Sequence, residues 1–322
     1  MLLSCYNKSG TIGACLDSVL AQKHDDYEVI VVDDGSTDGS SQILDKYHDP
    51  RVRVLHCNHG GASSAKNEGI RHMKGEIAVF LDGDCVIPPE FLSDLSQVYA
   101  GNGVDIVGGE VRALNSDRIV AKTVELMQND VRRRWPFGAN VAYTKGVISG
   151  IGLFDVSMYA GEDVDYYLRA LKSGFRSLLT ATPRAFTVNP SSLRSLFRQR
   201  FRWARGFAYL TEKYPEVFTL RIKLCFALNA AILVSTLLIV LSPLCAAIPL
   251  VLLSVDVLRF VPQATMASRK SGDPRHATLI PVLRVVNAYA YFFGFIYEKT
   301  RLLLGLRKKF LCFNPSQNVV LR

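Results

Sequence analysis

A short apolar run that ends in two acidic residues constrains this chain more than any other feature. Residues 77–81 read Ile-Ala-Val-Phe-Leu, which is typical of a strand buried on both faces. Asp82, Gly83 and Asp84 follow directly. Two carboxylates at the end of a buried strand repel each other and lose hydration, so they need a positive partner. A divalent cation shared with substrate phosphates would supply it, although Asp-Gly is also an ordinary turn pair.

Strands and helices are expected to alternate along the first two thirds of the chain. The patterns predict strands at residues 2–5, 28–32, 51–56, 77–81 and 104–107, a loop and strand at 137–143, and helices at 11–22, 62–73, 89–99, 117–134 and 161–173. This alternation predicts a Rossmann-like α/β domain with a mainly parallel sheet. Asp33 and Asp34 end the strand at 28–32, so both acidic clusters should lie at the carboxyl edge of one sheet, where such folds bind ligands.

Glu162 and Asp163 lie in the first turn of the helix expected at 161–173. The helix dipole favours an ionised carboxylate there, and an ionised carboxylate is what a general base requires. Acidic residues are also common at helix starts for purely structural reasons. The pattern by itself therefore leaves both interpretations open.

Residues 194–205 read RSLFRQRFRWAR, a strongly basic segment with aromatic residues. On a helix, Gln199, Arg202 and Trp203 share one face, which Arg198 and Arg205 extend. Such a face can stack on a sugar or a hydrophobic acceptor and neutralise a departing diphosphate. It can equally rest on anionic lipid as a basic amphipathic helix.

These motifs together resemble those of a known family. The ordered set is Tyr6-Asn7, Val32-Asp33-Asp34-Gly35-Ser36, Gly60-Gly61-Ala62 with Ala65-Lys66-Asn67-Glu68-Gly69, Leu81-Asp82-Gly83-Asp84, Gly161-Glu162-Asp163 and Gln199-Arg200-Phe201-Arg202-Trp203. Over residues 1–215 the chain resembles the family 2 glycosyltransferases of the GT-A fold. It is most similar to the membrane-attached members with D, DxD, ED and QxxRW motifs, which include polysaccharide synthases and lipid glycosyltransferases.

The resemblance implies a role for each matching residue. The implied donor-binding residues are Ser4, Tyr6, Asp34, Lys66 and Asp82; the implied ligands of Mg or Mn are Asp84 and Asp82; the implied catalytic pair is Asp163, as the general base, with Glu162; and the implied acceptor and diphosphate residues are Gln199, Arg202 and Trp203. The chain departs from the family in three ways. The first strand is short, Lys66 stands where Arg is frequent, and Gly161 replaces a frequent Thr.

The last third of the chain predicts a membrane region at residues 216–322, after a catalytic domain at 1–215. The apolar stretch of about residues 224–261 is long enough for a helical hairpin of two spans that turns near Pro243. A third apolar helix is expected at about residues 279–305. Basic residues flank it on both sides, which favours an interfacial or re-entrant helix: Arg269, Lys270 and Arg275 before it, and Arg301, Arg307, Lys308 and Lys309 after it.

Composition agrees with a multi-pass membrane protein whose catalytic domain faces the cytoplasm. The seven cysteines are scattered without a CxxC pair, which argues for reduced thiols and against a zinc site or a disulfide framework. No signal peptide is visible at the start of the chain. The net charge of +9 is expected to face an anionic leaflet rather than a nucleic acid.

The expected function is therefore a metal-dependent, inverting hexosyl transfer from a nucleotide-diphosphate sugar, with a UDP-sugar favoured, to a lipid-linked or glycan acceptor at the membrane. The alternative is a processive polysaccharide synthase of the cellulose or hyaluronan synthase type, for which the chain offers few spans. A sensor or scaffold that lost activity would not need the full set of motif residues. A nucleotidyltransferase would need a glycine-rich phosphate loop where residues 7–10 read Asn-Lys-Ser-Gly.

Overall fold

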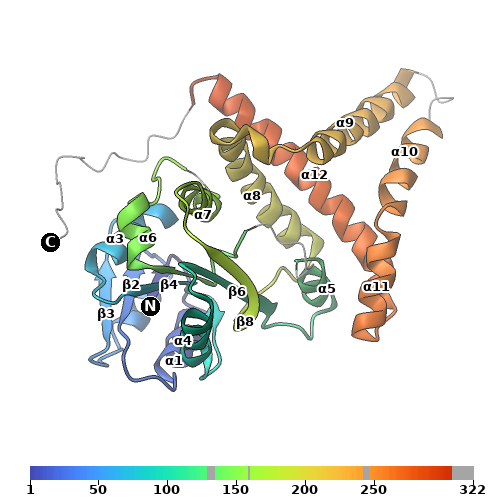
Figure 1. Ribbon diagram of the computed structural model, residues 1–322. Helices are drawn as coiled ribbons and strands as arrows, with labels where there is room; N and C mark the ends of the chain where they lie inside the picture. The colour runs from blue at the N-terminus through green and yellow to red at the C-terminus, as the bar shows by residue number, and fades with distance from the viewer. Residues whose placement is uncertain (129–134, 159, 242–246, 307–322) are drawn as a thin grey trace.

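The protein is organised around one mixed β-sheet, seen in a computed structural model that describes residues 1–128, 135–158, 160–241 and 247–306 (Figure 1). Within these residues the sheet has eight strands in the order β3-β2-β1-β4-β7-β6-β8-β5. The strands are β1 (Leu2–Cys5), β2 (Val29–Asp33), β3 (Val52–His56), β4 (Ile77–Asp82), β5 (Cys85–Val86), β6 (Ile106–Ala113), β7 (Val141–Thr144) and β8 (Ser177–Thr187).

Helices cover both faces of this sheet and continue into a C-terminal group. They are α1 (Ile12–Leu20), α2 (Ser40–Leu44), α3 (Ala62–His72), α4 (Phe91–Asn102), α5 (Ile119–Gln128), α6 (Lys145–Ile151), α7 (Glu162–Lys172), α8 (Leu193–Lys213), α9 (Leu220–Leu241), α10 (Ala247–Leu258), α11 (Val261–Ser271) and α12 (Arg275–Leu303). The predicted elements are present. Strands β5 and β8 and helices α6 and α11 were not predicted, and residues 129–134 of the predicted helix at 117–134 lie outside the described part.

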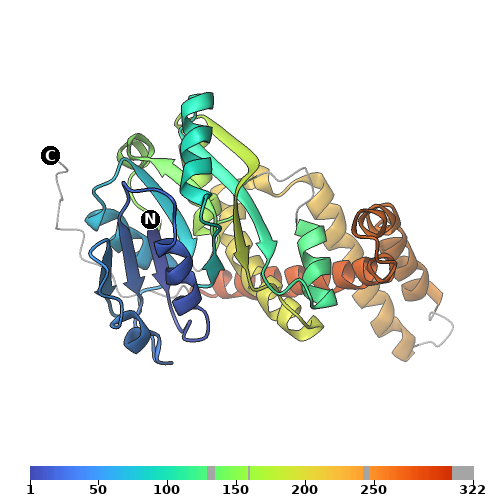
Figure 2. The same ribbon diagram turned by 90° about the horizontal axis from the view of Figure 1, so that it is seen from below.

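Alternating strand residues bury the two faces of the sheet. Leu3, Val31 and Leu81 pack towards one face with residues of α1 and α4. Leu2, Ile30 and Phe80 belong to the opposite core with residues of α3, α6 and α7. The sheet is therefore a central layer between two helical layers, as Figures 1 and 2 show.

The direction of the strands differs from the predicted, mainly parallel sheet in its second half. Strands β3, β2, β1 and β4 are parallel neighbours, as expected. Strand β7 is antiparallel to both β4 and β6, and β5 is antiparallel to β8. A buried strand is apolar whichever way it runs, so its composition does not reveal its direction.

Helices α8 and α12 pack side by side and run in the same direction (Figure 1). Near their starts Leu196 packs with Ile280 and Leu283, and further along Phe207 packs with Phe295. About one turn beyond Phe295, Glu298 is buried, and it accepts hydrogen bonds from Arg205 Nε at 2.6 Å and from the Tyr209 hydroxyl at 3.1 Å. An ion pair between Arg205 and Glu298 thus joins α8 to α12.

The C-terminal helices bear on part of the predicted membrane region. Within the described residues one helix, α12, is long and apolar enough to span a bilayer, although a third of its apolar window is buried in the protein. The helices Ile248–Leu258 and Val261–Ser271 are bent by 42° relative to each other. They add a second span only if together they cross the membrane as one broken helix. Within the described residues the apolar stretch of α9, Ile222–Thr236, is shorter than a full span, and the hairpin at 224–261 stays a prediction. The predicted turn near Pro243 and the basic residues Arg307, Lys308 and Lys309 lie outside the described residues.

We expect Glu298→Ala to lower the free energy of unfolding by about 3–5 kcal/mol, because it leaves the Arg205 charge buried without its carboxylate. Glu90→Ala is the matched control, since Glu90 pairs with Lys23 and both side chains are exposed. In the control, the free energy of unfolding should fall by less than about 1 kcal/mol. Chemical unfolding of the purified protein measures both, and equal losses would contradict this role of Glu298.

Candidate active site

The two acidic clusters meet at one edge of the sheet, as predicted. Ser4 in β1 is level with Val32 of β2 on one side and with Asp82 of β4 on the other. The carbonyl of Ser4 accepts a hydrogen bond from the Gly83 backbone amide at 3.0 Å. The first strand therefore sits between the acidic ends of its two neighbours and holds them at a common level.

Asp84 already has a cation beside it. The Lys8 ammonium donates to Asp84 Oδ2, and the Thr187 hydroxyl of β8 donates to Asp84 Oδ1 at 3.3 Å. Burial raises the pKa of Asp82, and the Lys66 and Lys8 charges counteract that effect. Sequence reasoning missed both partners of Asp84: Lys8 adjoins the Tyr6-Asn7 motif, whereas nothing in the sequence pointed to Thr187.

A divalent cation fits this arrangement. No group of three or more His, Cys, Asp or Glu side chains capable of holding a metal occurs in the described ranges. A magnesium-like ion, however, commonly uses only one or two carboxylates and takes its other ligands from substrate phosphates and water. Asp84, with a lysine cation in contact, and Asp82 nearby match that limited donor set.

Lys66 and Glu162 form a buried ion pair that links α3 to α7, with the Lys66 Nζ 2.7 Å from Glu162 Oε1. Burial acts against the charged form of Glu162, but Lys66 prevails and lowers the pKa of that carboxyl. Asp82 and Asp163 also lie close enough to act on the Lys66 charge. The ammonium of Lys66 thus balances the acidic cluster, and its closest described partner is Glu162.

Asp163 has the properties of a base that titrates near neutrality. Its Oδ1 accepts the backbone N–H of Val164 at 2.9 Å. Burial, reinforced by the Glu162 charge, raises the pKa of Asp163 to about 6. A Cβ at Gly138 would lie 2.6 Å from Asp163 Oδ2, so any side chain there would displace the carboxylate. Gly138 is a second residue of the site that no sequence pattern singled out.

Asp34 organises the neighbouring loop. Its two carboxylate oxygens accept the backbone amides of Gly60 and Gly61 at 2.7 and 2.9 Å. His59 Nδ1 lies 2.8 Å from Asp34 Oδ2, and the His59 ring stacks on Tyr6 with their centroids 4.1 Å apart. Both rings are partly exposed and form a flat aromatic surface beside the acidic edge. His59, which adjoins the predicted Gly60-Gly61 motif, was not recognised from the sequence.

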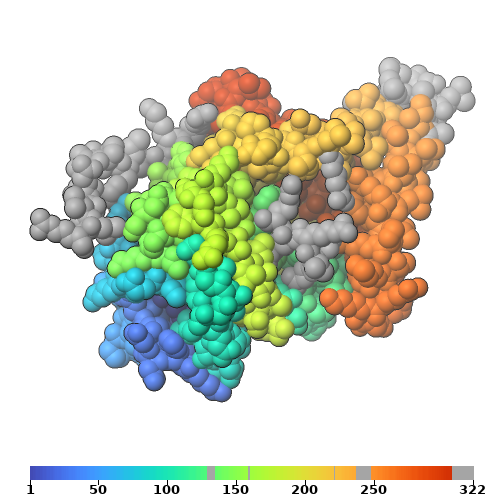
Figure 3. All heavy atoms as spheres, in the orientation of Figure 1, coloured from blue at the N-terminus to red at the C-terminus, as the bar shows by residue number. Residues whose placement is uncertain are grey.

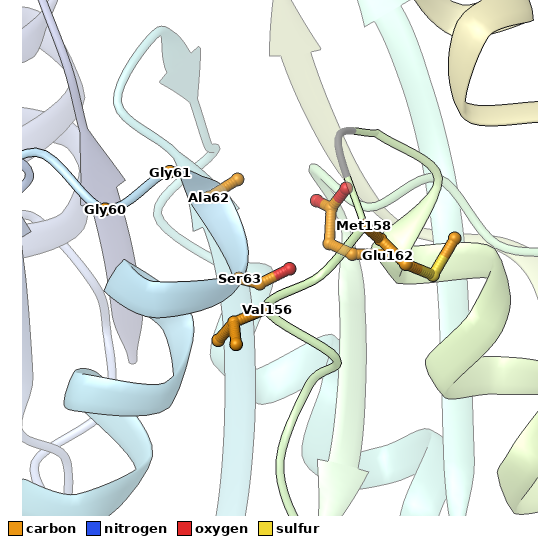
Figure 4. Close-up of a pocket in the computed structure, with 7 residues that line it drawn as sticks. All are labelled: Gly60, Gly61, Ala62, Ser63, Val156, Met158 and Glu162. Atoms are coloured by element: carbon orange, nitrogen blue, oxygen red, sulfur yellow. The ribbon is translucent and has the colours of Figure 1, made fainter. Parts of the chain in front are cut away.

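A small pocket lies between this loop and the acidic helix start. Its walls are Gly60, Gly61, Ala62, Ser63, Val156, Met158 and Glu162. In Figure 4 the Glu162 carboxylate points across the opening towards the first turn of α3. Residues of the two halves of the α/β domain therefore converge here.

Helix α8, which carries the QxxRW residues, packs against the start of α7, where Glu162 and Asp163 lie. Gly161, at the N-cap of α7, has φ +81°, and a Cβ there would lie 3.1 Å from Leu210 of α8. Glycine suits this left-handed backbone, whereas the β-branched Thr frequent in similar sequences does not. Two to three turns before Leu210 on α8, Arg202 and Trp203 are exposed, while Gln199 is half-buried. Arg205, predicted to share their face, instead contacts Glu298 of α12.

Comparisons with known sequences agree on the class of protein. Glycosyltransferase AglE from Haloferax volcanii is 29% identical over 64% of this chain and 71% of its own length. The poly-beta-1,6-N-acetyl-D-glucosamine synthase of Staphylococcus epidermidis is 27% identical over 69% of this chain and 58% of its own length. Uncharacterized glycosyltransferase EpsJ from Bacillus subtilis is 36% identical, but over 41% of this chain and 39% of its own length. The chain thus spans only part of most of these relatives.

Solved structures show the same fold. The mannosyltransferase PcManGT from Pyrobaculum calidifontis, in complex with GDP-Man and Mn2+, superposes with a TM-score of 0.60 at 19% identity, over 92% of this chain and 86% of that one. S. aureus TarS 1-349 in complex with UDP-GlcNAc gives a TM-score of 0.51 at 16% identity, over 93% of this chain and 90% of that one. Residues 2–152 match the family described as glycosyl transferase family 2. Residues 2–152 therefore form a glycosyl transferase family 2 region, and the chain has the GT-A fold of the solved glycosyltransferases.

Proposed function

We propose that this enzyme transfers a sugar, with inversion, from a nucleotide-diphosphate sugar to a lipid-linked acceptor at the cytoplasmic face of a membrane. The acidic cluster carries the proposal, because it combines a metal-type carboxylate, Asp84, with a separate carboxylate, Asp163, of raised pKa. The fold relatives in complex with GDP-Man and UDP-GlcNAc support a nucleotide-sugar donor. We favour a UDP-sugar.

The donor would bind along the carboxyl edge of the sheet. The stacked Tyr6 and His59 rings offer an aromatic surface for the base, and Asp34 keeps the loop that carries His59 in place. Ser4 would flank the base, and Asp82 would lie by the ribose. Asp84 and Asp82 would hold Mg or Mn at the diphosphate, where the ion offsets the charge that develops on the leaving group.

Asp163 would act as the general base. It would take the proton of the acceptor hydroxyl as the acceptor oxygen attacks the anomeric carbon and the bond to the diphosphate breaks. Lys66 keeps Glu162 ionised and fixed beside it, which orients the start of α7. Gln199, Arg202 and Trp203 would line the acceptor and leaving-group end. A single base suffices, because inversion needs no covalent intermediate on the enzyme.

Exposed apolar side chains support attachment to a membrane. They gather on α9 to α12, at the yellow-to-red end of the molecule in Figure 3: Leu220, Leu224, Val234, Ile248, Leu250, Val251, Val255, Leu258, Met266, Val282, Phe293, Ile296 and Leu303. Such an apolar surface is unusual for a protein surrounded by water. Because α12 packs on α8, a lipid acceptor would reach the site from this side.

A processive polysaccharide synthase is the second candidate, favoured by the likeness to the poly-beta-1,6-N-acetyl-D-glucosamine synthase of S. epidermidis. Size analysis of the product distinguishes the two functions. A long polymer made by the purified protein would exclude single transfer to a lipid.

Replacing Asp84 with Ala should weaken Mn-dependent binding of the nucleoside diphosphate by at least about tenfold, or ~1.4 kcal/mol, because the cation loses its main protein ligand. Asp26→Ala is the matched control, since Asp26 is exposed and the change in net charge is the same. Calorimetric titration with and without EDTA measures both variants. Equal Mn-dependent affinity in Asp84→Ala and the wild type would refute the metal assignment.

Asp163→Asn should reduce transfer by about 10²- to 10⁴-fold, because the amide cannot accept the acceptor proton. Donor binding should remain within about twofold of wild type, since Asp163 does not contact the donor in this proposal. Single-turnover transfer and donor titration on the same sample separate the two effects. Wild-type turnover would show that another group is the base.

The pH dependence of transfer should follow the raised pKa of Asp163. A base works when deprotonated, so kcat/KM should be level above about pH 7 and fall about tenfold per pH unit below about pH 6. An acid limb centred near pH 4, the ordinary value for an aspartate, would contradict the assignment.

A further inference from the structure

Arg200 is a buried cation that the reaction described above does not use. It lies inside the QxxRW segment at a position that the motif leaves open, and only 6% of its surface is exposed. Among the described residues its guanidinium has no hydrogen-bond or ion-pair partner, and its Nε is fully buried. A buried arginine normally has an anionic partner, because an unpaired buried charge is costly.

The groups closest to Arg200 are aromatic rings and a second arginine. Its guanidinium carbon lies 4.2 Å from the centroid of the Trp203 ring, so one face of the group is covered while its N–H edge stays unpaired. Burial lowers the pKa of Arg200 to about 10; the neighbouring Tyr291 acts against this shift, and the like charge of Arg284 on α12 adds to it. Two cations therefore share this region, and no carboxylate is among the groups found to act on Arg200.

An adjacent group also lacks its partner. The Oε1 atom of Gln199 is buried and accepts no hydrogen bond. On a helix, residues three and four apart are neighbours, so Gln199 and Arg200 both adjoin Trp203. The ligand that fits this set combines an anionic oxygen for the guanidinium with a hydroxyl for the amide carbonyl. A phosphate monoester in its monoanionic form provides both.

We propose that Arg200, with Gln199 beside it, binds the phosphate group of a lipid phosphate at the junction of α8 and α12. Arginine suits phosphate because its planar N–H edge forms two parallel, charge-assisted hydrogen bonds. The lipid chain would lie along the exposed apolar side chains of α12, such as Val282 and Phe293. The inference rests on the proposed transfer to a lipid acceptor, and it specifies that the acceptor carries a phosphate.

Trp203 provides the probe, because the chain has two tryptophans, Trp135 and Trp203. In a Trp135→Phe background the fluorescence of Trp203 is titrated with geranyl phosphate, geraniol or inorganic phosphate in detergent. Geranyl phosphate should bind with saturation, geraniol should not, and inorganic phosphate should bind at least tenfold more weakly.

Arg200→Gln in the same background should weaken geranyl phosphate binding by about 10- to 100-fold, the range for a lost charged hydrogen bond. Arg200→Lys, which keeps the charge but loses the paired geometry, should fall in between. Arg53→Gln is the matched control: an exposed arginine on β3, at the far edge of the sheet, whose loss should change affinity less than twofold. A melting curve checks folding, and if Arg200→Gln does not fold, Arg200→Lys decides.

Three results would overturn the proposal: unchanged affinity in the Arg200 variants, equal binding of geraniol, or inorganic phosphate binding as tightly as geranyl phosphate. The last result would assign the residue to a free anion instead of a lipid. The proposed function is tested separately by Mn-dependent release of nucleoside diphosphate from donor by the wild-type protein. Failure of the proposed function is therefore distinguishable from failure of the lipid-phosphate site.

Discussion

The buried ammonium of Lys66 is the charge on which the active site depends. It lies 2.7 Å from Glu162 and acts on Asp82 and Asp163 as well, so one cation serves three carboxylates. Without it these carboxylates would be held together against their mutual repulsion in a partly desolvated place. A lysine is a compact point charge, and this suits a position among several acids better than the directional guanidinium of an arginine.

A second buried ion pair, between Arg205 and Glu298, fixes the helix that carries the QxxRW residues. Glu298 on α12 holds Arg205 and Tyr209 of α8, the helix that carries Gln199, Arg202 and Trp203. The position of these motif residues is therefore set by a helix that begins some seventy residues later in the chain. Under the proposed function, α12 would serve both membrane attachment and the acceptor end of the site.

Three residues in or beside the family motifs have different physical meanings. Gly161 adopts a left-handed backbone next to Leu210, which explains a glycine at that position. Lys8 places a cation of the protein itself beside Asp84, the carboxylate proposed as the main metal ligand. Arg200, by contrast, has one face of its guanidinium covered by Trp203 and its buried Nε unpaired within the described residues, and this imbalance points to a ligand.

The sequence by itself determined the α/β class, the parallel half of the sheet and the meeting of Asp34 with Asp82 and Asp84 at one edge, because periodicity and strand ends are local properties. Only the tertiary structure decided the antiparallel direction of β7, the pairing of Lys66 with Glu162 across 96 residues, and the contacts of Lys8, His59, Thr187 and Gly138. Among the described residues, it also showed that α12 is long and apolar enough to span a membrane. Strand direction and long-range charge pairs depend on where the chain returns in space, and the pattern of neighbouring residues does not encode that return.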